Sequence, residues 1–494
     1  MTKKYILAFD QGTTSSRTAI INADGSIKGI YQEEFSQLFP KPGWVEHNPL
    51  EIVKVQISTF KKAITQNKIE LAEIAGIGIA NQRETTVVWN KHTGKPIYNA
   101  IVWQDKRTVD ICENLKKKGL NEYVKKTTGL VIDSFFSATK INWILNNIPG
   151  AKEEAEKGNL LFGTIDTWLL WNFTKGEVHA TDYSNASRTM LFDIVNLRWD
   201  RTLLKALEIP ESMLPQVQPS SGYFGDFIIE KYKIPITGIA GDQQAALFGQ
   251  ACFKKGEVKN TYGTGCFMLL NTGEEVKYSK NGLLSTIAWG IDNKVYYALE
   301  GSVFVAGAAI QWLKDGLQII KEAKDSEYCS NQVEGENPVY VVPAFAGLGA
   351  PYWDMYARGA IFGLTFNTGK NHLVKATLNS LAYQTKDVLN AMQKDSKIKL
   401  KILRVDGGVC ANDLLMQFQS DILNIKVEKP KIIESTIMGA GYLAGIYVGM
   451  WKQGSIHEKR KISKVFLPNI SQEKREKLYK KWKEAVKRTK NWIN

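Results

Sequence analysis

The chain has 494 residues, of which 44% are hydrophobic and 23% are charged, which is ordinary for a globular protein with about two to four domains and large cores. The net charge is +14, but residues 454–494 alone hold 13 Lys and Arg against four Asp and Glu. The rest of the chain is near balance, so the charge does not indicate a nucleic-acid-binding protein. We expect residues 454–494 to include a docked helix with a solvated basic face, and the alternative is that this segment contacts nucleic acid.

No segment predicts a leader or a membrane span. The apolar run Tyr5–Phe9 is too short for a signal peptide, and the longest uncharged apolar stretch, Met438–Trp451, falls short of the roughly 20 residues that a span needs. We interpret the second stretch as a buried helix and expect a cytoplasmic protein. Reduced thiols and no metal cage are expected, because the five His are dispersed and no C-x-x-C pairs the scattered Cys112, Cys252, Cys266, Cys329 and Cys410.

The first predicted elements are two strands around a polar loop. Tyr5–Phe9 ends on Asp10, a loop rich in Gly, Thr and Ser follows, and a second apolar run ends at Ile21 before an Asp24-Gly25 hairpin turn. Backbone N–H groups and hydroxyls in such a loop can hold phosphate oxygens, and an acid at the strand end can hold Mg²⁺ through water. This pattern is typical of the actin, hexokinase and Hsp70 type of nucleotide site. The alternative is an ordinary Ser/Thr-rich turn.

A similar pattern recurs halfway along the chain. Val258–Leu270 again predicts strand, polar loop and strand, and the runs Leu284–Trp289 and Val295–Leu299 flank a turn at Asp292-Asn293. We therefore predict two duplicated α/β domains, residues 1–248 and 249–494. Helices are predicted over Leu50–Thr65, Gly301–Leu317 and Asn371–Met392, from Asn412 onward, and around Leu478, Trp482, Ala485 and Val486.

Three segments carry candidate chemistry. Arg83 and Glu84 break a strand and together suit the hydroxyls of a polyol, the alternative being a surface ion pair. Asp242 follows a buried strand and opens an Ala-rich helix, where a carboxylate can accept a hydroxyl proton during phosphoryl transfer; the alternative is a helix N-cap. The turn at Gly407-Gly408 lets the backbone approach a nucleotide.

Together these motifs resemble the FGGY family of carbohydrate kinases, and within it the glycerol kinases, over essentially the whole chain. The resemblance rests on seven segments: Asp10–Arg17, Asn81–Thr85, Phe135–Trp143, Gly163–Trp168, Gly241–Gly249, Asn260–Phe267 and Arg404–Gly408. It implies an α/β fold with two actin-like (ribonuclease H-like) ATPase domains flanking a central cleft. The implied reaction transfers the γ-phosphate of ATP to glycerol with Mg²⁺, giving sn-glycerol 3-phosphate and ADP.

The resemblance also implies roles for individual residues. Asp242 would be the catalytic base, and Asp10 would organise Mg²⁺. The substrate-binding residues would be Arg83, Glu84, Trp103, Phe135, Asp242, Gln243 and Phe267. The nucleotide-binding residues would be Thr13, Thr14, Ser15, Arg17, Thr264, Gly265, Gly307, Gln311, Gly408 and Asn412. A homodimer or homotetramer is expected because relatives form both.

The chain departs from the family pattern at several positions. Phe135 stands where a Tyr is usual, so one hydroxyl donor toward glycerol is missing, and Asn379 stands where an acid is usual. Residues 228–234 contain neither the phosphorylatable His nor the Gly-Lys-Gly-Gly-Thr-Arg loop by which some relatives are regulated. Two other functions remain open: an FGGY kinase for a pentulose or gluconate, and an actin- or Hsp70-like ATPase module.

Overall fold

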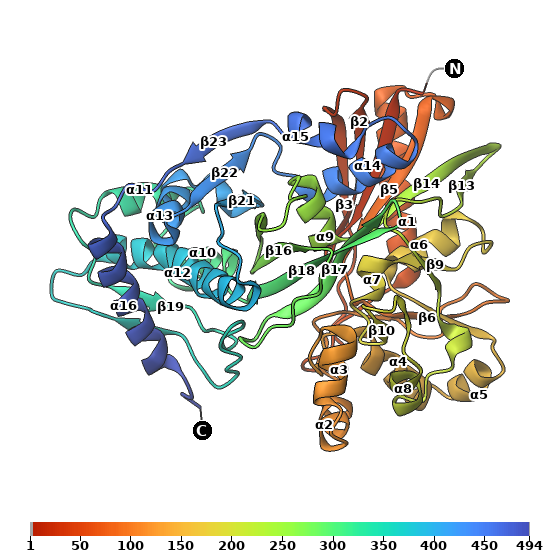
Figure 1. Cartoon of the computed structure of the whole chain (residues 1–494), viewed down its shortest axis with the longest axis horizontal. Coiled ribbons are helices and arrows are strands. Elements are labelled where there is room, and N and C mark those ends of the chain that lie inside the picture. Colours follow the sequence, from red (N-terminus) through yellow and green to blue (C-terminus); the bar gives the residue numbers. More distant parts are fainter. Residues whose placement is uncertain (1–2, 494) are drawn as a thin grey trace.

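The computed structural model describes residues 3–493, which form two halves, each built on one mixed β-sheet (Figure 1). The first sheet has six strands in the order β13-β14-β5-β1-β2-β3, and the second has seven in the order β17-β18-β16-β15-β21-β22-β23. The strands of the first sheet are β1 (Tyr5–Gln11), β2 (Ser15–Asn22), β3 (Ile27–Glu34), β5 (Ile74–Asn81), β13 (Asp226–Ile229) and β14 (Tyr232–Gly241). Those of the second are β15 (Val258–Tyr262), β16 (Cys266–Gly273), β17 (Leu284–Ile291), β18 (Lys294–Val303), β21 (Ile402–Asp406), β22 (Lys426–Pro430) and β23 (Ile462–Phe466).

The two sheets share a core arrangement, and the second sheet adds β17 at one edge. In the first sheet, β1 pairs antiparallel with β2 on one side and parallel with β5 on the other. In the second sheet, β15 pairs antiparallel with β16 on one side and parallel with β21 on the other. The predicted turn at Asp292-Asn293 is confirmed, since both residues have positive φ, as a tight hairpin turn requires. The duplicated α/β architecture is therefore confirmed. The division at residues 248 and 249 stays a prediction.

The long helices lie close to where the sequence predicts them. They are α1 (Pro49–Asn67), α12 (Lys370–Ser396), α13 (Asp413–Leu423) and α16 (Gln472–Thr489). Asn48 and Asn412 cap α1 and α13 by accepting backbone N–H bonds with their side chains. A helical insert between β7 (Ala100–Ile101) and β12 (Gln216–Gln218), which the sequence analysis did not foresee, contains α2 (Val109–Lys117), α3 (Asn121–Thr128), α4 (Ser137–Asn147), α5 (Ala151–Glu156), α6 (Ile165–Phe173), α7 (Tyr183–Ala186) and α8 (Arg201–Ala206).

The prediction of one helix over Gly301–Leu317 is wrong. Strand β18 continues to Val303, and only α10 (Gly307–Gln311) and a following π-turn to Gly316 are helical. Residues 297–303 pair with β16, and residues 294–300 pair with β17. An apolar run such as Val303–Ile310 suits either a buried helix or a buried strand. Here pairing with strands elsewhere in the sheet extends β18 to Val303.

One helix of the second half lies on the first sheet. In Figure 1, α14 (Ser435–Tyr447), drawn in blue, lies beside the red and orange strands, and it contacts β1, β5 and β14. Its crossing with α9 (Asp242–Gly249) is so close that a Cβ on Gly439 would lie 1.8 Å from the carbonyl oxygen of Ala245. This contact ties the two halves together beneath the candidate site.

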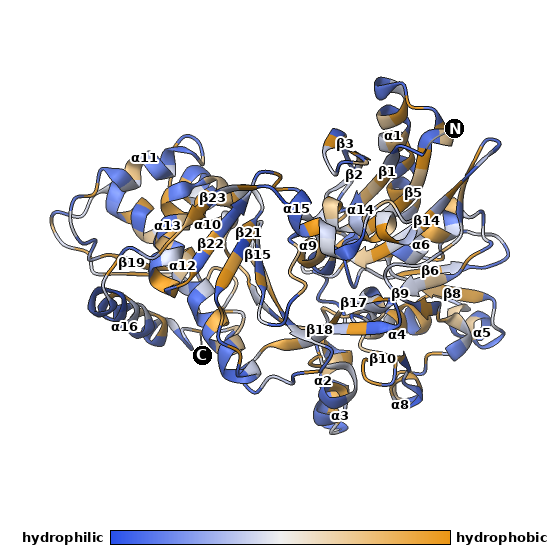
Figure 2. Ribbon diagram, turned by 45° about the horizontal axis from the view of Figure 1, so that its top comes forward, coloured by the Kyte–Doolittle hydropathy of each residue, from blue (hydrophilic) through white to orange (hydrophobic). Residues whose placement is uncertain are grey.

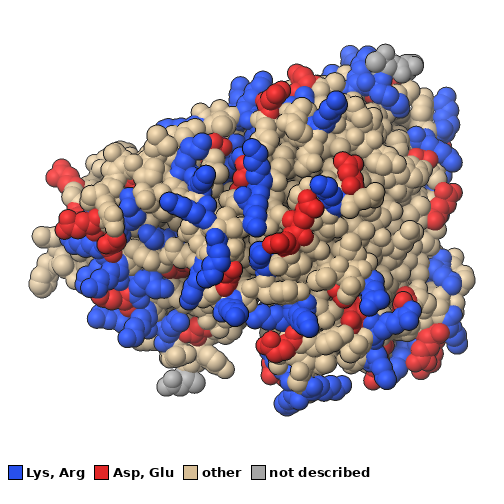
Figure 3. Space-filling view, in the orientation of Figure 1, with Lys and Arg blue, Asp and Glu red and all other residues tan. Residues whose placement is uncertain are grey.

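The basic C-terminal helix α16 is docked, as predicted. Trp482, Ala485 and Val486 are buried in the core of the second half, whereas most of the helix is hydrophilic (Figure 2). Lys and Arg are spread over both halves of the face in Figure 3 rather than gathered on one element. Within residues 3–493, no helix combines the length and the apolar character needed to cross a bilayer, and the five Cys are buried and unpaired.

Candidate active site

The predicted phosphate loop is a tighter hairpin than expected. Strand β2 already begins at Ser15, so only Gly12–Thr14 separate the two strands, and Asp10 pairs in register with Arg17. The Arg17 Nη1 atom lies 3.8 Å from Asp10 Oδ2 and 2.7 Å from Oε2 of Glu434, the residue that precedes α14. The hairpin thus holds the Arg17 guanidinium group between a carboxylate of the first half, Asp10, and one of the second half, Glu434. Thr14, in the same hairpin, is exposed.

Asp10 fits the expected Mg²⁺ role. Burial raises the pKa of its carboxyl group to about 7, with Arg17 opposing the shift and the Asp242 and Glu434 carboxylates adding to it. Such excess negative charge favours a divalent cation, and Mg²⁺ commonly takes one or two carboxylates plus substrate phosphates. Within residues 3–493, no group of three or more His, Cys, Asp and Glu could hold a metal by itself.

Arg83 and Glu84 belong to a buried ion network, so the alternative of a surface pair is wrong. Their side chains are 3% and 2% exposed. Arg83 forms a two-pronged pair with Glu300 on β18, and Arg188 donates to Glu84 Oε1 at 2.6 Å and to Glu300 Oε1 at 3.0 Å. Burial raises the pKa of Glu300, but Arg188 and Arg83 outweigh it and lower the pKa to about 2. Two Arg and two Glu compensate each other, which makes this network rigid.

Asp242 is the first residue of α9, at the end of β14, and is not its N-cap. Its Oδ1 accepts the Gln243 backbone N–H at 2.6 Å and lies 3.2 Å from Arg83 Nε. The side chain is 29% exposed, although Arg83 beneath it is buried. Burial raises the pKa of Asp242, while Arg83 and Lys259 oppose the rise. A fixed, accessible carboxylate of this kind can accept a proton.

The aromatic candidates from the first half lie together. The rings of Trp103 and Phe135 are 5.3 Å apart, and the Arg188 guanidinium lies 6.0 Å from the Phe135 ring. Trp103 Nε1 also donates to Thr13 Oγ1 at 3.0 Å, which joins the aromatic pair to the phosphate hairpin. Phe267 is half-buried on β16 of the second half, paired with Ser302.

The remaining candidates for the nucleotide belong to the second half. Thr264, Gly307 and Gln311 line one pocket with Trp312, and Gly307 N donates to the Gly263 carbonyl at 3.0 Å. A Cβ on Gly265 would lie 2.4 Å from the Val303 carbonyl, which explains the glycine there. Gly408 is exposed after β21, and Asn412 caps α13, so the structure gives Asn412 a structural role as well.

Sequence reasoning missed five charged residues of this region. Arg188, Lys259, Glu300, Asp406 and Glu434 lie far apart in sequence and meet the predicted residues only in the fold. The one local signal was a charged residue within or at the end of an apolar strand, as at Lys259 and Glu300. Such a residue must be paired when buried.

The two actin-like halves, the phosphate hairpin and the accessible carboxylate at a helix start define a two-domain kinase of the actin-like fold. Models of the FGGY family of carbohydrate kinases match residues 5–249 (N-terminal domain) and 258–448 (C-terminal domain). The chain belongs to this family.

Several relatives resemble the chain over its full length. It is 60% identical to a glycerol kinase of Carboxydothermus hydrogenoformans over 100% of this chain and 99% of the relative, and 60% identical to glycerol kinase 1 of Clostridium tetani over 99% of each. A crystal structure of Plasmodium falciparum glycerol kinase with ADP superposes with a TM-score of 0.93 at 39% identity, covering 99% of this chain and 98% of that one. A xylulose kinase of Lactobacillus acidophilus, 21% identical with a TM-score of 0.87 over 98% of each chain, shares the fold.

Proposed function

We propose that the protein is a glycerol kinase, which transfers the γ-phosphoryl group of ATP to glycerol and releases sn-glycerol 3-phosphate and ADP. The full-length similarity to glycerol kinases supports this assignment. The observation that carries it in the structure is the Asp242 carboxylate, which stays accessible above the compensated Arg83–Glu84–Arg188–Glu300 network. A site with fixed donors and acceptors recognises hydroxyl groups and rejects ligands that leave its polar groups unpaired.

The reaction needs little covalent help from the protein. Asp242 accepts the proton of the attacking glycerol hydroxyl. The hydroxyl oxygen bonds to the γ-phosphorus, and the bond from that phosphorus to the β–γ bridging oxygen breaks. Arg83, Glu84 and Gln243 orient glycerol. Trp103 and Phe267 pack against its carbon atoms, beside the Phe135 ring. The Gly12–Thr14 turn, Ser15 and Arg17 hold phosphate oxygens beside Thr264 and Gly265, while Gly307, Gln311, Gly408 and Asn412 surround the nucleoside. Asp10 would hold Mg²⁺, which would supply neutralisation of phosphate charge when bound.

The test is Asp242→Asn. We expect it to lower glycerol-dependent ADP release by at least about 100-fold, because a general base contributes about that much or more. ADP affinity should stay near that of the wild type. The exposed Asp110→Asn, in the first turn of α2, is the matched control and should keep full activity.

Two results would overturn the assignment. Wild-type enzyme that releases ADP equally well without glycerol would instead be an ATPase module. A clear preference for a pentulose or gluconate over glycerol would indicate another FGGY sugar kinase.

The proposal includes the cellular compartment and the oligomeric state of the enzyme. We place it in the cytoplasm, since five buried unpaired thiols suit a reducing compartment. A homodimer or homotetramer is part of the proposal, and light scattering after size-exclusion chromatography measures it.

A further inference from the structure

Lys259 is a buried lysine that crosses from the second half to the candidate glycerol site. It lies on β15 with no exposed surface, and its Nζ donates to Gln243 Oε1 in the first turn of α9 and to Thr261 Oγ1 at 2.8 Å. Removing a lysine from water is costly unless its charge is compensated and its protons are bonded. Its position therefore calls for an explanation beyond space filling.

The contact fixes which way the Gln243 amide faces. A lysine ammonium group can only donate, so the atom that meets Lys259 must be the amide oxygen. The amide nitrogen then faces away from Lys259, and within residues 3–493 it has no hydrogen-bond partner. Gln243 adjoins Asp242 and is 8% exposed, so this free N–H₂ group is a donor beside the catalytic carboxylate.

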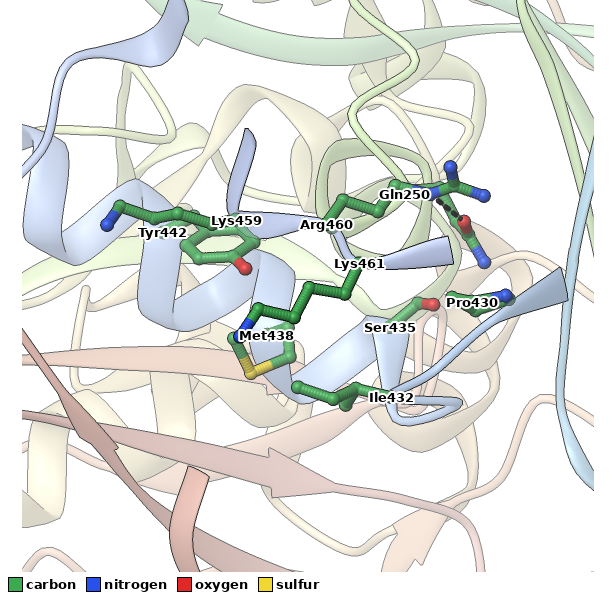
Figure 4. A pocket seen from close by; sticks show the side chains of 10 residues that line it. Gln250, Pro430, Ile432, Ser435, Met438, Tyr442, Lys459, Arg460 and Lys461 are labelled. Carbon is green, nitrogen blue, oxygen red and sulfur yellow. Dashed lines mark hydrogen bonds between the residues drawn. The ribbon is translucent and has the colours of Figure 1, made fainter. Parts of the chain in front are cut away.

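A second group of polar side chains surrounds Asp406, whose charge acts on Lys259. Asp406, on the neighbouring parallel strand β21, accepts from Gln250 Nε2 at 2.8 Å, and Gln250 in turn accepts from Arg460 Nε at 2.7 Å. Figure 4 shows this Gln250–Arg460 bond at the pocket between α14 and the segment that leads into β23. Burial lowers the pKa of Lys259 to about 8, with Asp406 and Asp242 opposing the shift and Arg83 adding to it.

We infer that Lys259 is a positioning residue for glycerol: by holding the Gln243 amide oxygen, it presents the amide nitrogen to a substrate hydroxyl next to Asp242. The inference rests on the proposed function. The alternative is that Lys259 only balances the buried charge of Asp406 and supports the fold. The two differ in one respect, because positioning acts through Gln243 whereas charge balance does not.

A double-mutant cycle on glycerol kinetics separates the two roles. Lys259→Met should raise the KM for glycerol by about fivefold, the usual order for one neutral hydrogen bond, with a smaller change in kcat. In a Gln243→Ala background the same substitution should change KM by only about twofold or less, because the amide that it positions is gone. An equal effect in both backgrounds, or an unchanged KM in folded Lys259→Met, would overturn the inference.

A second variant decides the matter if Lys259→Met does not fold. Gln243→Glu keeps an oxygen for Lys259 but replaces the donor that faces the substrate. We expect its Tm to hold or rise while the KM for glycerol rises about tenfold. A fall in Tm, or an unchanged KM, would show that the amide does not face Lys259 and glycerol as inferred.

Lys386→Met is the control. Lys386 on α12 is also a largely buried lysine, and its Nζ donates to the Ile422 carbonyl at 2.6 Å, outside the candidate site. This variant should leave the KM for glycerol unchanged, and an increase equal to that of Lys259→Met would overturn the inference. Wild-type activity is measured first, so a protein that does not phosphorylate glycerol refutes the proposed function rather than the role of Lys259.

Discussion

At the scale of single residues, the candidate site is a set of buried charges with one accessible carboxylate. Arg83, Arg188, Glu84 and Glu300 compensate each other, and removal of any one would leave an unpaired charge in the interior. Asp242 adjoins this set but keeps an accessible surface. Its contacts with the Gln243 backbone N–H and Arg83 fix this carboxylate in place.

Phe135→Tyr should improve the binding of glycerol. The Phe135 ring lies between Trp103 and Arg188 and lacks the hydroxyl that the family usually has there. One added neutral hydrogen bond is worth about 1 kcal/mol, so the KM for glycerol should fall about fivefold with kcat retained. Phe136→Tyr is the control, because Phe136 is 1% exposed and a hydroxyl there should lower Tm without lowering KM. An unchanged KM in Phe135→Tyr would mean that this ring does not face the substrate.

Activity should fall on the acid side. Burial raises the pKa of Asp242 despite the opposing Arg83 and Lys259, and only the ionised carboxylate can accept a proton. As pH decreases through this raised pKa, kcat/KM should therefore fall, beginning above the ordinary aspartate value of about 3.9. The measurement is kcat/KM for glycerol against pH at saturating MgATP. A profile that stays flat down to about pH 4 would contradict the assigned base.

At the scale of elements, the geometry depends on close backbone contacts. The β1–β2 hairpin places Asp10 opposite Arg17, and the α9–α14 crossing fixes the helix that carries Asp242. The sequence shows the strands and the helix, because periodicity and turn residues are local. It does not show the crossing, because Gly439 and Gly249 are recognisable as contact glycines only once both helices are placed.

Gly439→Ala should destabilise the protein. The added Cβ would lie 1.8 Å from the Ala245 carbonyl oxygen, so a helix must shift, at a cost of about 3 kcal/mol or more. Thermal unfolding measures the effect. Gly454→Ala is matched as a control, since no neighbour lies within 4 Å of its Cβ position, and its Tm should stay close to that of the wild type. Equal Tm values for both variants would show that α14 does not approach α9 this closely.

At the scale of the whole molecule, two halves with the same core arrangement of strands meet at the site, and the turn between β13 and β14 in the first half is short. Strands β13 and β14 join through Glu230 and Lys231 alone, which is where some relatives carry their bisphosphate-binding loop. Fructose 1,6-bisphosphate should therefore leave the initial rate unchanged, as should the sugar-phosphotransferase carrier, because no His precedes β14 at this place. Clear inhibition by the bisphosphate at physiological concentration would show a binding surface elsewhere.

Motifs along the chain were enough to predict the duplicated fold, the hairpin after Asp10 and the place of Asp242 at a helix start, because turn residues, apolar periodicity and an acid at a strand end all act over a few neighbouring positions. Packing between distant segments settled the rest. It extended β18 where a helix was expected, and it turned Arg83 and Glu84 from a possible surface pair into a buried network with Arg188 and Glu300. Burial of a charge depends on which remote partner compensates it, and that partner becomes a neighbour only when the chain is folded.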